Sequence, residues 1–497
     1  VRIRHAAPFY MNQVSPTNKI SKYVKLLANC VISFLILCSC ILIFYAIFKI
    51  NFLSKNISLY FYFICILCGI FFNLFMIYVF FYFKDNSKIN ISLFFLSVGI
   101  SLYCFEIYLE YSKEKNYKMK IEEDKKLTQS ILNFVEKNGL SYDNRTKIEV
   151  LNDLKKMGYN SFPNILPSFF LSNKSTVNGL DNLNEKIYPL GGISNITTIL
   201  SNELGYYPII QTDQYGFKNP ENFYNEEIDI ALIGDSYAEG SSVKENQNIA
   251  SVLRSNELKT INFGMGGIGS LIEYAIFREY IIKLKPKNIV WLFCFNDFEN
   301  LRKELNSDLL KKYIYDDNFS QNLITKQKMI DILLKQYAKK EKAKENQKNN
   351  AKISVEKNNI YSTFIIFIER FKLSNLRSLL KLNPIQNNNH DEIKKIIFDI
   401  ISKTNESISM WEGKLFLVYI PKSLINGNSK DLKSIANREF ISNLAEELNI
   451  PFLDLKKDVF SHLDDPLILL PFRLKGHYNE IGYKLISDEI IKMIEKN

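Results

Sequence analysis

Three long uncharged runs dominate the first part of the chain. Leu26–Phe48 has 23 residues without a charge, Ile57–Phe83 has 27, and Ile89–Phe105 has 17. Because about 20 apolar residues span the hydrocarbon core of a bilayer, the first two runs predict transmembrane helices. The third predicts another if it extends to Tyr108 past Glu106, a side chain that can lie at headgroup depth. No small-residue cleavage site follows the first run, which favours permanent anchoring over a signal peptide. We therefore expect three transmembrane helices over residues 26–110.

The basic residues predict an orientation for these helices. The tail at residues 1–25 carries five Lys or Arg residues and no acid, which places it in the cytoplasm by the positive-inside rule. Three crossings then put the rest of the chain on the opposite side, although lysines after the third helix argue weakly for the reverse. We expect a bacterial inner-membrane protein whose main domain is periplasmic or extracytoplasmic.

Residues 111–225 change character twice. Residues 113–138 mix charges with apolar positions at helical spacing, which predicts an amphipathic juxtamembrane helix. From residue 141 onward come five prolines, several glycines and many asparagines, which is typical of irregular structure. A stretch of this length is either functional, packed against a neighbour, or a spacer that lifts the next domain off the membrane. The sequence leaves these alternatives open.

Short apolar runs alternate with helical patterns over residues 226–490. There are five such runs, of which the first four are followed by turn residues: Ile228–Ile233, Thr260–Phe263, Asn288–Phe295, Lys414–Ile420 and Ile450–Leu455. Fully apolar short strands between helices predict an α/β fold with a parallel sheet covered on both faces. About 110 residues separate the third and fourth strands, more than a crossover needs, so we expect a helical insertion at about 305–410. Its polar stretch at 335–359 is predicted to be solvated and mobile.

Composition and charge exclude some partners. The 497 residues hold 63 Lys+Arg and 53 Asp+Glu, a net charge of +10. The lysines alternate with acids and asparagines, and no Arg-rich stripe with aromatic residues is present, so we predict no nucleic-acid partner. Six of the seven cysteines lie inside the apolar runs, and none has the spacing of a zinc site. We predict no metal and no cofactor.

Candidate chemistry gathers where the strands end. Ser236 follows the first strand, glycines between 264 and 269 follow the second, and Asn296 follows the third. A serine in such a turn can act as a nucleophile, and glycine N–H groups and an Asn amide can donate to a developing oxyanion. His477, which precedes the terminal helical pattern, is the candidate base. Glu273, Arg278 and Glu279 are expected on a solvated helix face, with an inward-facing ion pair as the alternative.

These residues carry a resemblance to the SGNH/GDSL hydrolases. Gly234-Asp235-Ser236 resembles block I of that family, and the six residues from Asn262 to Gly267 are similar to block II. Asn296-Asp297 resembles block III, and His477 with Asn479 and Gly482 resembles block V. The four motifs occur in order within residues 226–490.

The resemblance implies both a fold and a site. The fold would be a flavodoxin-like, three-layer α/β/α domain with a five-stranded parallel sheet. Ser236 would be the nucleophile and His477 the base, and the oxyanion hole would comprise the Ser236 N–H, the Gly267 N–H and the Asn296 side chain.

The chain departs from the family at the acid that orients the histidine. The family places an aspartate two or three residues before the histidine, whereas this chain has Lys475 and Leu474 there. Three outcomes are open: another acid (Asp464, Asp465 or Asp454) takes the role, a backbone carbonyl takes it, or activity is lost.

Membrane-tethered members of the family resemble enzymes of alginate and peptidoglycan O-acetylation. This resemblance implies a membrane-anchored serine esterase or O-acyltransferase that acts on acyl esters of a cell-surface or exported glycan. Three helices are few for moving acyl groups across a bilayer, so a transferase would need a polytopic membrane partner that donates them. The alternative is a catalytically inactive module that binds glycan or an assembly partner. A lysophospholipase-like lipid esterase is a third hypothesis, favoured only if the cleft opens as an apolar groove toward the membrane.

Overall fold

The computed structural model describes residues 22–52, 59–171, 179–182, 185–221, 223–354, 373–380, 390–422, 424 and 432–497. The chain divides into two units. The membrane unit comprises residues 1–121 and 358–387, and the globular unit comprises residues 122–357 and 388–497.

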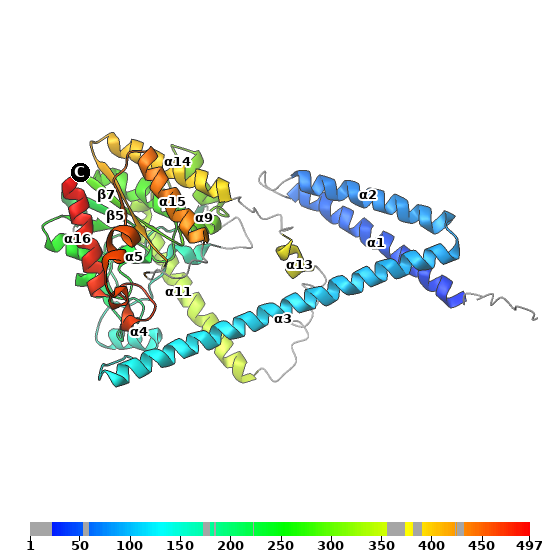
Figure 1. The fold of residues 1–497 in the computed structure, drawn as a ribbon, viewed down its shortest axis with the longest axis horizontal. Helices are drawn as coiled ribbons and strands as arrows, with labels where there is room; N and C mark the ends of the chain where they lie inside the picture. Colours follow the sequence, from blue (N-terminus) through cyan, green and yellow to red (C-terminus); the bar gives the residue numbers. More distant parts are fainter. Residues whose placement is uncertain are drawn as a thin grey trace, which may run out of the picture. The chain divides into compact units, whose positions relative to one another are not determined.

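Three helices form most of the membrane unit: α1 (Lys22–Phe52), α2 (Leu59–Tyr82) and the start of α3 (Asp85–Lys137) (Figure 1). Each is long and apolar enough to cross a membrane. The structure differs from the prediction in one respect, because the third span and the juxtamembrane helix form one continuous helix. The segment from residue 113 to Lys137 contains no Gly or Pro, so nothing in it interrupts the helix.

The globular unit is built on one parallel sheet of five strands. Its strands are β5 (Ile230–Gly234), β6 (Thr260–Asn262), β7 (Asn288–Cys294), β8 (Lys414–Ile420) and β9 (Phe452–Asp454). They are ordered β6-β5-β7-β8-β9, and all four neighbouring pairs are parallel. This is the flavodoxin-like order, in which the first strand lies between the second and the third. The predicted fold class is confirmed.

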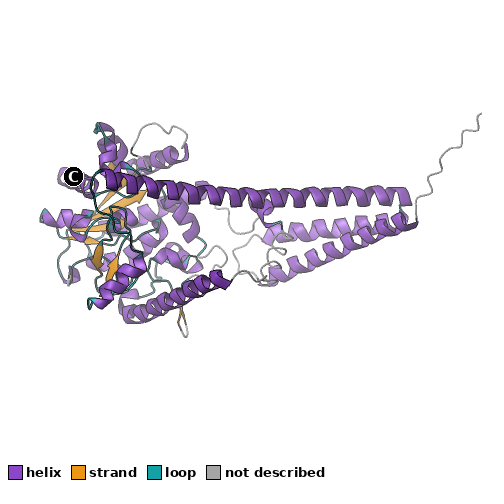
Figure 2. Cartoon of the chain, turned by 90° about the horizontal axis from the view of Figure 1, so that it is seen from below, coloured by secondary structure: helices purple, strands orange, loops and turns teal. Residues whose placement is uncertain are grey.

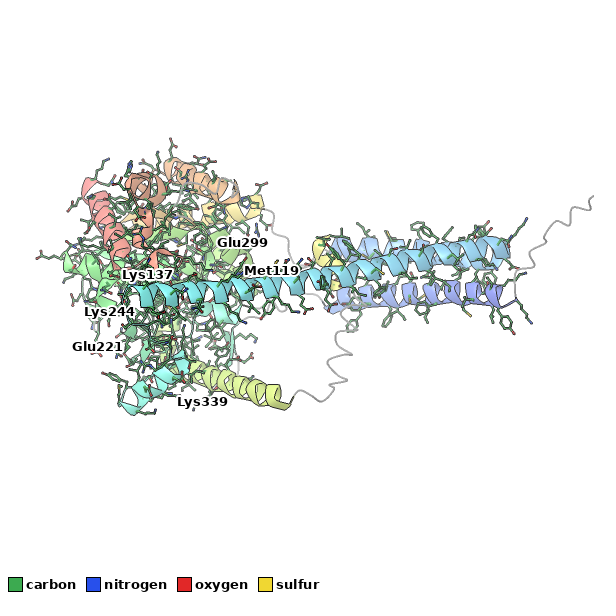
Figure 3. The ribbon with its side chains drawn as sticks, turned by 60° about the horizontal axis from the view of Figure 1, so that its bottom comes forward. Met119, Lys137, Glu221, Lys244, Glu299 and Lys339 are labelled. Atoms are coloured by element: carbon green, nitrogen blue, oxygen red, sulfur yellow. The ribbon has the colours of Figure 1, made fainter. Side chains whose placement is uncertain are left out.

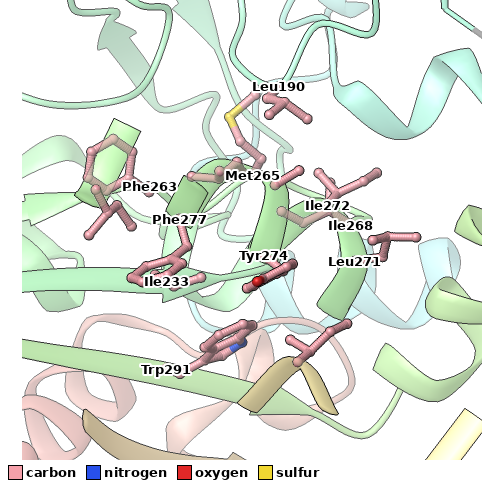
Figure 4. Close-up of a cluster of buried hydrophobic side chains, with 14 of the residues drawn as sticks. Leu190, Ile233, Phe263, Met265, Ile268, Leu271, Ile272, Tyr274, Phe277 and Trp291 are labelled. Carbon is pink, nitrogen blue, oxygen red and sulfur yellow. The ribbon is translucent and has the colours of Figure 1, made fainter. Parts of the chain in front are cut away.

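Helices cover both faces of the sheet (Figure 2). Because side chains alternate along a strand, Trp291 of β7 points to one core and Leu292 to the other. The helices of the globular unit are α4 (Lys147–Lys156), α5 (Ser236–Glu239), α6 (Ile249–Ser255), α7 (Ser270–Ile276), α8 (Ile282–Leu284), α9 (Asp297–Glu304), α10 (Asp308–Tyr315), α11 (Leu323–Ser354), α14 (His390–Ser409), α15 (Leu432–Glu447) and α16 (Glu480–Lys496). Residues of α7, α9, α14 and α15 lie in the core of Trp291, and residues of α6 and α16 lie in the core of Leu292. Figure 4 shows Trp291 with Phe277 and Met265 in the larger core.

The irregular extension is an integral part of this unit. It contains two antiparallel strand pairs: β1 (Leu180–Asn182) with β2 (Glu185–Ile187), and β3 (Thr197–Ile199) with β4 (Ile209–Gln211). Phe170, Tyr188 and Phe217 from the extension are buried in the same core as Trp291. The extension therefore packs against the sheet domain, and the spacer alternative is wrong.

The described part of the insertion is more regular than its composition suggests. The Lys- and Gln-rich stretch predicted to be solvated continues α11 as far as Ser354, and residues 355–359 of that prediction lie outside the described residues. Figure 3 shows Lys339 on this helix. The helix α10 packs on α7, and Glu279 is buried there, where it accepts hydrogen bonds from the Tyr313 hydroxyl and the Gln321 N–H. The expectation of a solvated Glu279 is wrong because the insertion covers this face.

Candidate active site

The sharp turn between β5 and α5 presents Ser236 at the carboxyl edge of the sheet. Asp235 caps α5, and its Oδ1 accepts a hydrogen bond from the Tyr237 N–H at 3.0 Å. Ser236 is therefore the first helical residue, and it is partly exposed while Asp235 behind it is buried. The capping interaction fixes the backbone on which the serine side chain stands.

His477 and Glu203 complete a chain of hydrogen bonds with Ser236. The His477 Nε2 lies 2.8 Å from the Ser236 Oγ, and the His477 Nδ1 lies 2.8 Å from the Glu203 Oε1. The other oxygen of Glu203 accepts a hydrogen bond from the His477 backbone N–H at 2.7 Å. An ionised carboxylate only accepts hydrogen bonds, so Nδ1 carries a proton and Nε2 is free to accept one from the serine. This is the geometry of a nucleophile, a base and an orienting acid.

The extension holds Glu203 in place. Glu203 lies in the loop between β3 and β4, and its neighbour Asn202 donates from its side-chain amide to the Asp143 carbonyl at 2.7 Å. The Asp143 N–H donates in turn to the Gly205 carbonyl at 2.8 Å. Gly205 has a φ of +86°, and a Cβ there would lie 2.7 Å from the Ser141 carbonyl oxygen. The segment that directly follows α3 thus clamps the loop that carries the acid.

The charges of Glu203 and His477 support each other. Burial alone would raise the pKa of the Glu203 carboxyl, but the hydrogen bonds from the His477 ring and N–H leave that pKa lowered. Burial alone would lower the pKa of the imidazole, but the hydrogen bond with Glu203 and its negative charge leave the His477 pKa above its ordinary value of 6.5. The carboxylate therefore stabilises the imidazolium that forms when the histidine takes a proton.

Asn296 and Gly267, the oxyanion donors that the resemblance implies, follow β7 and β6, the two strands that flank β5. The Asn296 Nδ2 donates one hydrogen bond to the Asp235 Oδ2 at 3.1 Å. A side-chain amide has two N–H groups, so one remains for a ligand. Gly267 is exposed and has a φ of +71°, a conformation that favours glycine. A Cβ at Gly264 would lie 2.2 Å from the Glu239 nitrogen, so the glycine turn packs directly on α5.

None of the three aspartates considered as orienting acids contacts the His477 ring, and two of them have other roles. Asp454 accepts hydrogen bonds from the Lys456 and Lys457 N–H groups, which caps the turn after β9. Asp465 accepts from the Leu467 N–H and pairs with Arg473. Asp464 is exposed.

Glu203 occupies the position at the His477 Nδ1, so another acid takes the orienting role, but it is none of the three aspartates named as candidates. No spacing pattern links Glu203 to His477, because 274 positions separate them. The only available signal was the turn-rich composition of the extension, which allowed a functional role.

A buried ion pair links α5 to the extension. The Lys218 Nζ donates to the Glu239 Oε1, and both side chains are 2% exposed. Lys218 comes from the extension, and Glu239 lies one helical turn after Ser236. The Asn164 side-chain amide also donates to Glu239, at 3.1 Å. The extension therefore supplies the acid of the site and also braces the helix that carries the serine.

Three buried groups near the site have the composition of a metal site. Ligand atoms of Asp235, Cys294 and Asp297 all lie within 4.8 Å of one another. However, the Cys294 thiol donates to the Asp235 Oδ1 at 3.0 Å, and the Cys294 N–H donates to the Asp297 Oδ2 at 2.7 Å. Burial raises the pKa of all three side chains. A metal would require the Cys294 thiol to lose the proton that it donates to Asp235, and burial opposes that loss.

A pocket lined by both apolar and polar side chains adjoins Ser236 and His477. Its volume is about 210 Å³. It is lined by the neighbours of Ser236 and His477 and by the end of β8: Tyr237, Pro421, Lys422, Leu424, Leu467, Leu470, Leu474, Lys475, Gly476 and Tyr478. The Tyr237 ring lies 4.8 Å from the His477 ring and forms part of the wall. Four leucines make the pocket suitable for a hydrocarbon group.

Fold and site together define an α/β domain with a Ser–His–Glu triad at the carboxyl edge of a parallel sheet. No family model matches the chain, and no curated protein matches its sequence.

Among solved structures, the chain is similar to a member of the lipolytic protein G-D-S-L family from Veillonella parvula, with 12% identity over 53% of this chain and 97% of that chain, and a TM-score of 0.30. It is also similar to the acetylxylan esterase Axe2 from Geobacillus stearothermophilus, with 15% identity, 53% and 93% coverage and a TM-score of 0.29. The acetyl xylan esterase AlAXEase gives 15% identity, 53% and 98% coverage and a TM-score of 0.29. Similarities this distant leave the activity of the chain to be inferred from its own site.

Proposed function

We propose that the chain is a membrane-anchored serine esterase or O-acyltransferase. Ser236 attacks an ester carbonyl while His477 takes its proton, and Glu203 stabilises the resulting imidazolium. The Ser236 N–H, the Gly267 N–H and the Asn296 amide stabilise the oxyanion. His477 then protonates the departing alcohol, and water or a second alcohol releases the acyl group from Ser236 by the reverse path.

One observation carries this proposal. The same histidine lies 2.8 Å from the Ser236 Oγ through one nitrogen and 2.8 Å from the Glu203 Oε1 through the other. A module that only binds ligands has no need for this arrangement. Glu203 fills the position whose apparent vacancy favoured an inactive module.

Labelling by a fluorophosphonate probe tests the nucleophile and the base. The full-length chain in detergent should be labelled, and Ser236→Ala and His477→Ala should both abolish labelling. Asp464→Asn is the matched control, since this exposed acid lies outside the site, and it should label like the parent. If the folded parent chain is not labelled, the enzyme proposal is contradicted and the inactive binding module becomes the favoured alternative.

The substrate proposed here is an acyl ester of a cell-surface or exported glycan, and a transferase would receive its acyl group from a polytopic membrane partner. The acyl-enzyme partitions between water and a sugar hydroxyl, so the two activities differ only in the acceptor. Incubation with p-nitrophenyl acetate and an oligosaccharide separates them. Acetylated sugar detected by mass spectrometry supports transfer, whereas release of acetate alone supports hydrolysis.

The leucines that line one part of the pocket favour a second candidate, an esterase for longer acyl chains or lipids. Four leucines beside the triad would bury methylenes of such a chain, each worth about 0.8 kcal/mol. A series of p-nitrophenyl esters from acetate to octanoate measures this directly. Rising kcat/KM with chain length, reversed by Leu470→Trp, supports the second candidate. A maximum at acetate supports the glycan esterase.

A further inference from the structure

A carboxylate of the membrane unit holds the start of a helix that lies far away in the sequence. Glu106 of α3 is fully buried. Its Oε1 accepts hydrogen bonds from the Asn375 N–H at 2.8 Å and from the Asn375 side-chain amide at 2.9 Å. Its Oε2 accepts from the Leu376 N–H at 2.8 Å. The carboxylate thus satisfies free N–H groups in the first turn of α13 (Ser374–Leu379), which lies beside α3 in Figures 1 and 3.

A second residue of α3 contacts the same position. The Lys113 Nζ donates to the Asn375 Oδ1 at 2.6 Å. Glu106 and Lys113 are two helical turns apart, so they lie on one face of α3. Asn375 is therefore held by a carboxylate on one side and by an ammonium group on the other.

The place of this contact along α3 is informative. Glu106 directly follows the 17-residue uncharged run that ends at Phe105. Lys113 and the charged residues after it belong to the segment that leaves the bilayer. Because α13 is hydrogen-bonded to both Glu106 and Lys113, its contact with α3 lies where an apolar span meets water.

The surface of α13 suits that location. Leu379 and Leu380 are each 56% exposed. Arg377 is in the same helix, and lysines occur at positions 372 and 381 of the sequence. Leucines together with basic residues are the composition of helices that lie in the interfacial layer of anionic bilayers.

We propose that α13 is a second membrane attachment of the chain and that Glu106 fixes it in the interfacial layer. Its leucines contact the upper part of the acyl chains, and Arg377 contacts anionic headgroups. The insertion of the sheet domain, from which α13 comes, is thereby bound to the bilayer independently of the covalent link through α3. This proposal does not depend on the esterase activity.

Quenching by brominated lipid tests the proposal on the full-length chain. Leu379→Trp is reconstituted in phosphatidylcholine–phosphatidylglycerol vesicles with and without brominated acyl chains, and the emission of the parent, from Trp291 and Trp411, is subtracted. The added emission should fall about twofold in brominated vesicles, as expected of a side chain at the acyl boundary. Ile332→Trp is the matched control, because Ile332 of α11 is 57% exposed on the globular unit, and its emission should be unchanged.

Two results would overturn the proposal. The first is an added emission from Leu379→Trp that bromination leaves unchanged, as expected if water or a protein partner covers α13. Leu380→Trp repeats the measurement should Leu379→Trp fold poorly. The second is quenching that survives Glu106→Gln undiminished, which would show that the carboxylate does not hold the helix in place. A quenched parent variant that loses quenching with Glu106→Gln supports both parts of the proposal.

Discussion

Replacing Glu203 by glutamine removes one charge and keeps the shape of the side chain. In the parent chain, both carboxylate oxygens of Glu203 accept hydrogen bonds from His477, one from Nδ1 at 2.8 Å and one from the backbone nitrogen at 2.7 Å. Glutamine offers one acceptor oxygen and one NH₂ group, so it can accept only one of the two bonds. If its NH₂ group faces Nδ1, the imidazole must carry its proton on Nε2, where it can no longer accept the proton of Ser236.

The expected loss follows from the tautomer and the missing charge. Where an orienting acid was converted to its amide in a serine protease, kcat fell about 10⁴-fold. Because the Glu203 side chain is still 23% exposed, solvent screens part of its charge, and we expect a decrease of about 10³–10⁴-fold in kcat. That corresponds to about 4–5.5 kcal/mol of transition-state stabilisation. KM should change little.

Steady-state hydrolysis of p-nitrophenyl acetate by the full-length chain measures kcat and KM. Thermal unfolding of the variant shows whether the fold survives. Asp464→Asn and Asp465→Asn, at two acids that precede His477 in the sequence, are the matched controls. A Glu203→Gln enzyme within tenfold of the parent would refute the assignment of the acid. A large decrease in kcat for Asp465→Asn, with no loss of thermal stability, would show that Asp465 rather than Glu203 is the orienting acid.

The same variant should also change the pH profile. His477 must be unprotonated to act as a base, and its pKa is raised above 6.5, so kcat/KM of the parent should fall as the pH drops through a midpoint above that value. Removing the negative charge of Glu203 lowers the pKa of the imidazole. The acid limb of Glu203→Gln should therefore move to lower pH, and a shift to higher pH would contradict this electrostatic account.

Three further substitutions test the supports of the site. Asn296→Ala should lower kcat about 10²–10³-fold with little change in KM, because one oxyanion donor is lost; steady-state kinetics decide this, and a pure KM effect would count against the role. Lys218→Met leaves Glu239 buried without its partner and should destabilise the globular unit by about 3–5 kcal/mol in chemical denaturation. The double variant with Glu239→Gln should recover part of that loss, and no recovery would argue against coupling. Gly264→Ala puts a Cβ 2.2 Å from the Glu239 nitrogen and should abolish activity or folding, whereas Gly99→Ala meets nothing within 4 Å and should behave like the parent.

The sheet could be predicted because its signals are local. The run Lys414–Ile420 is a strand with those bounds, and the run Asn288–Phe295 differs from β7 by one residue. A buried parallel strand is recognisable from a short apolar stretch bounded by turn residues. The strands then bring Ser236 and Asn296 to one edge, since both follow the ends of neighbouring parallel strands.

The acid could not be predicted because its position depends on tertiary structure alone. Glu203 lies in a loop with no motif, and only the packing of the extension on the sheet domain brings it to His477. The same cause explains Glu273, which was expected in solvent but is buried and accepts a hydrogen bond from the Trp291 Nε1 at 2.8 Å. Helical periodicity assigns an outer face to a helix but does not show what other parts of the chain cover.

The hydrogen bonds between Asp143 and the Glu203 loop make the proposed catalysis depend on residues that lie outside every motif of the family. A fragment that begins at residue 226 would keep every block of the hydrolase resemblance and would lack its acid. A fragment that begins after Asp143 would keep the acid and lose the backbone bonds that seat its loop. We therefore expect the proposed activity to be lost when the loop more than 30 residues before Ser236 is deleted or loosened, even with Ser236 and His477 in place. A survey that judged competence only from the residues just before the histidine would miss the carboxylate that Glu203 places at the His477 Nδ1.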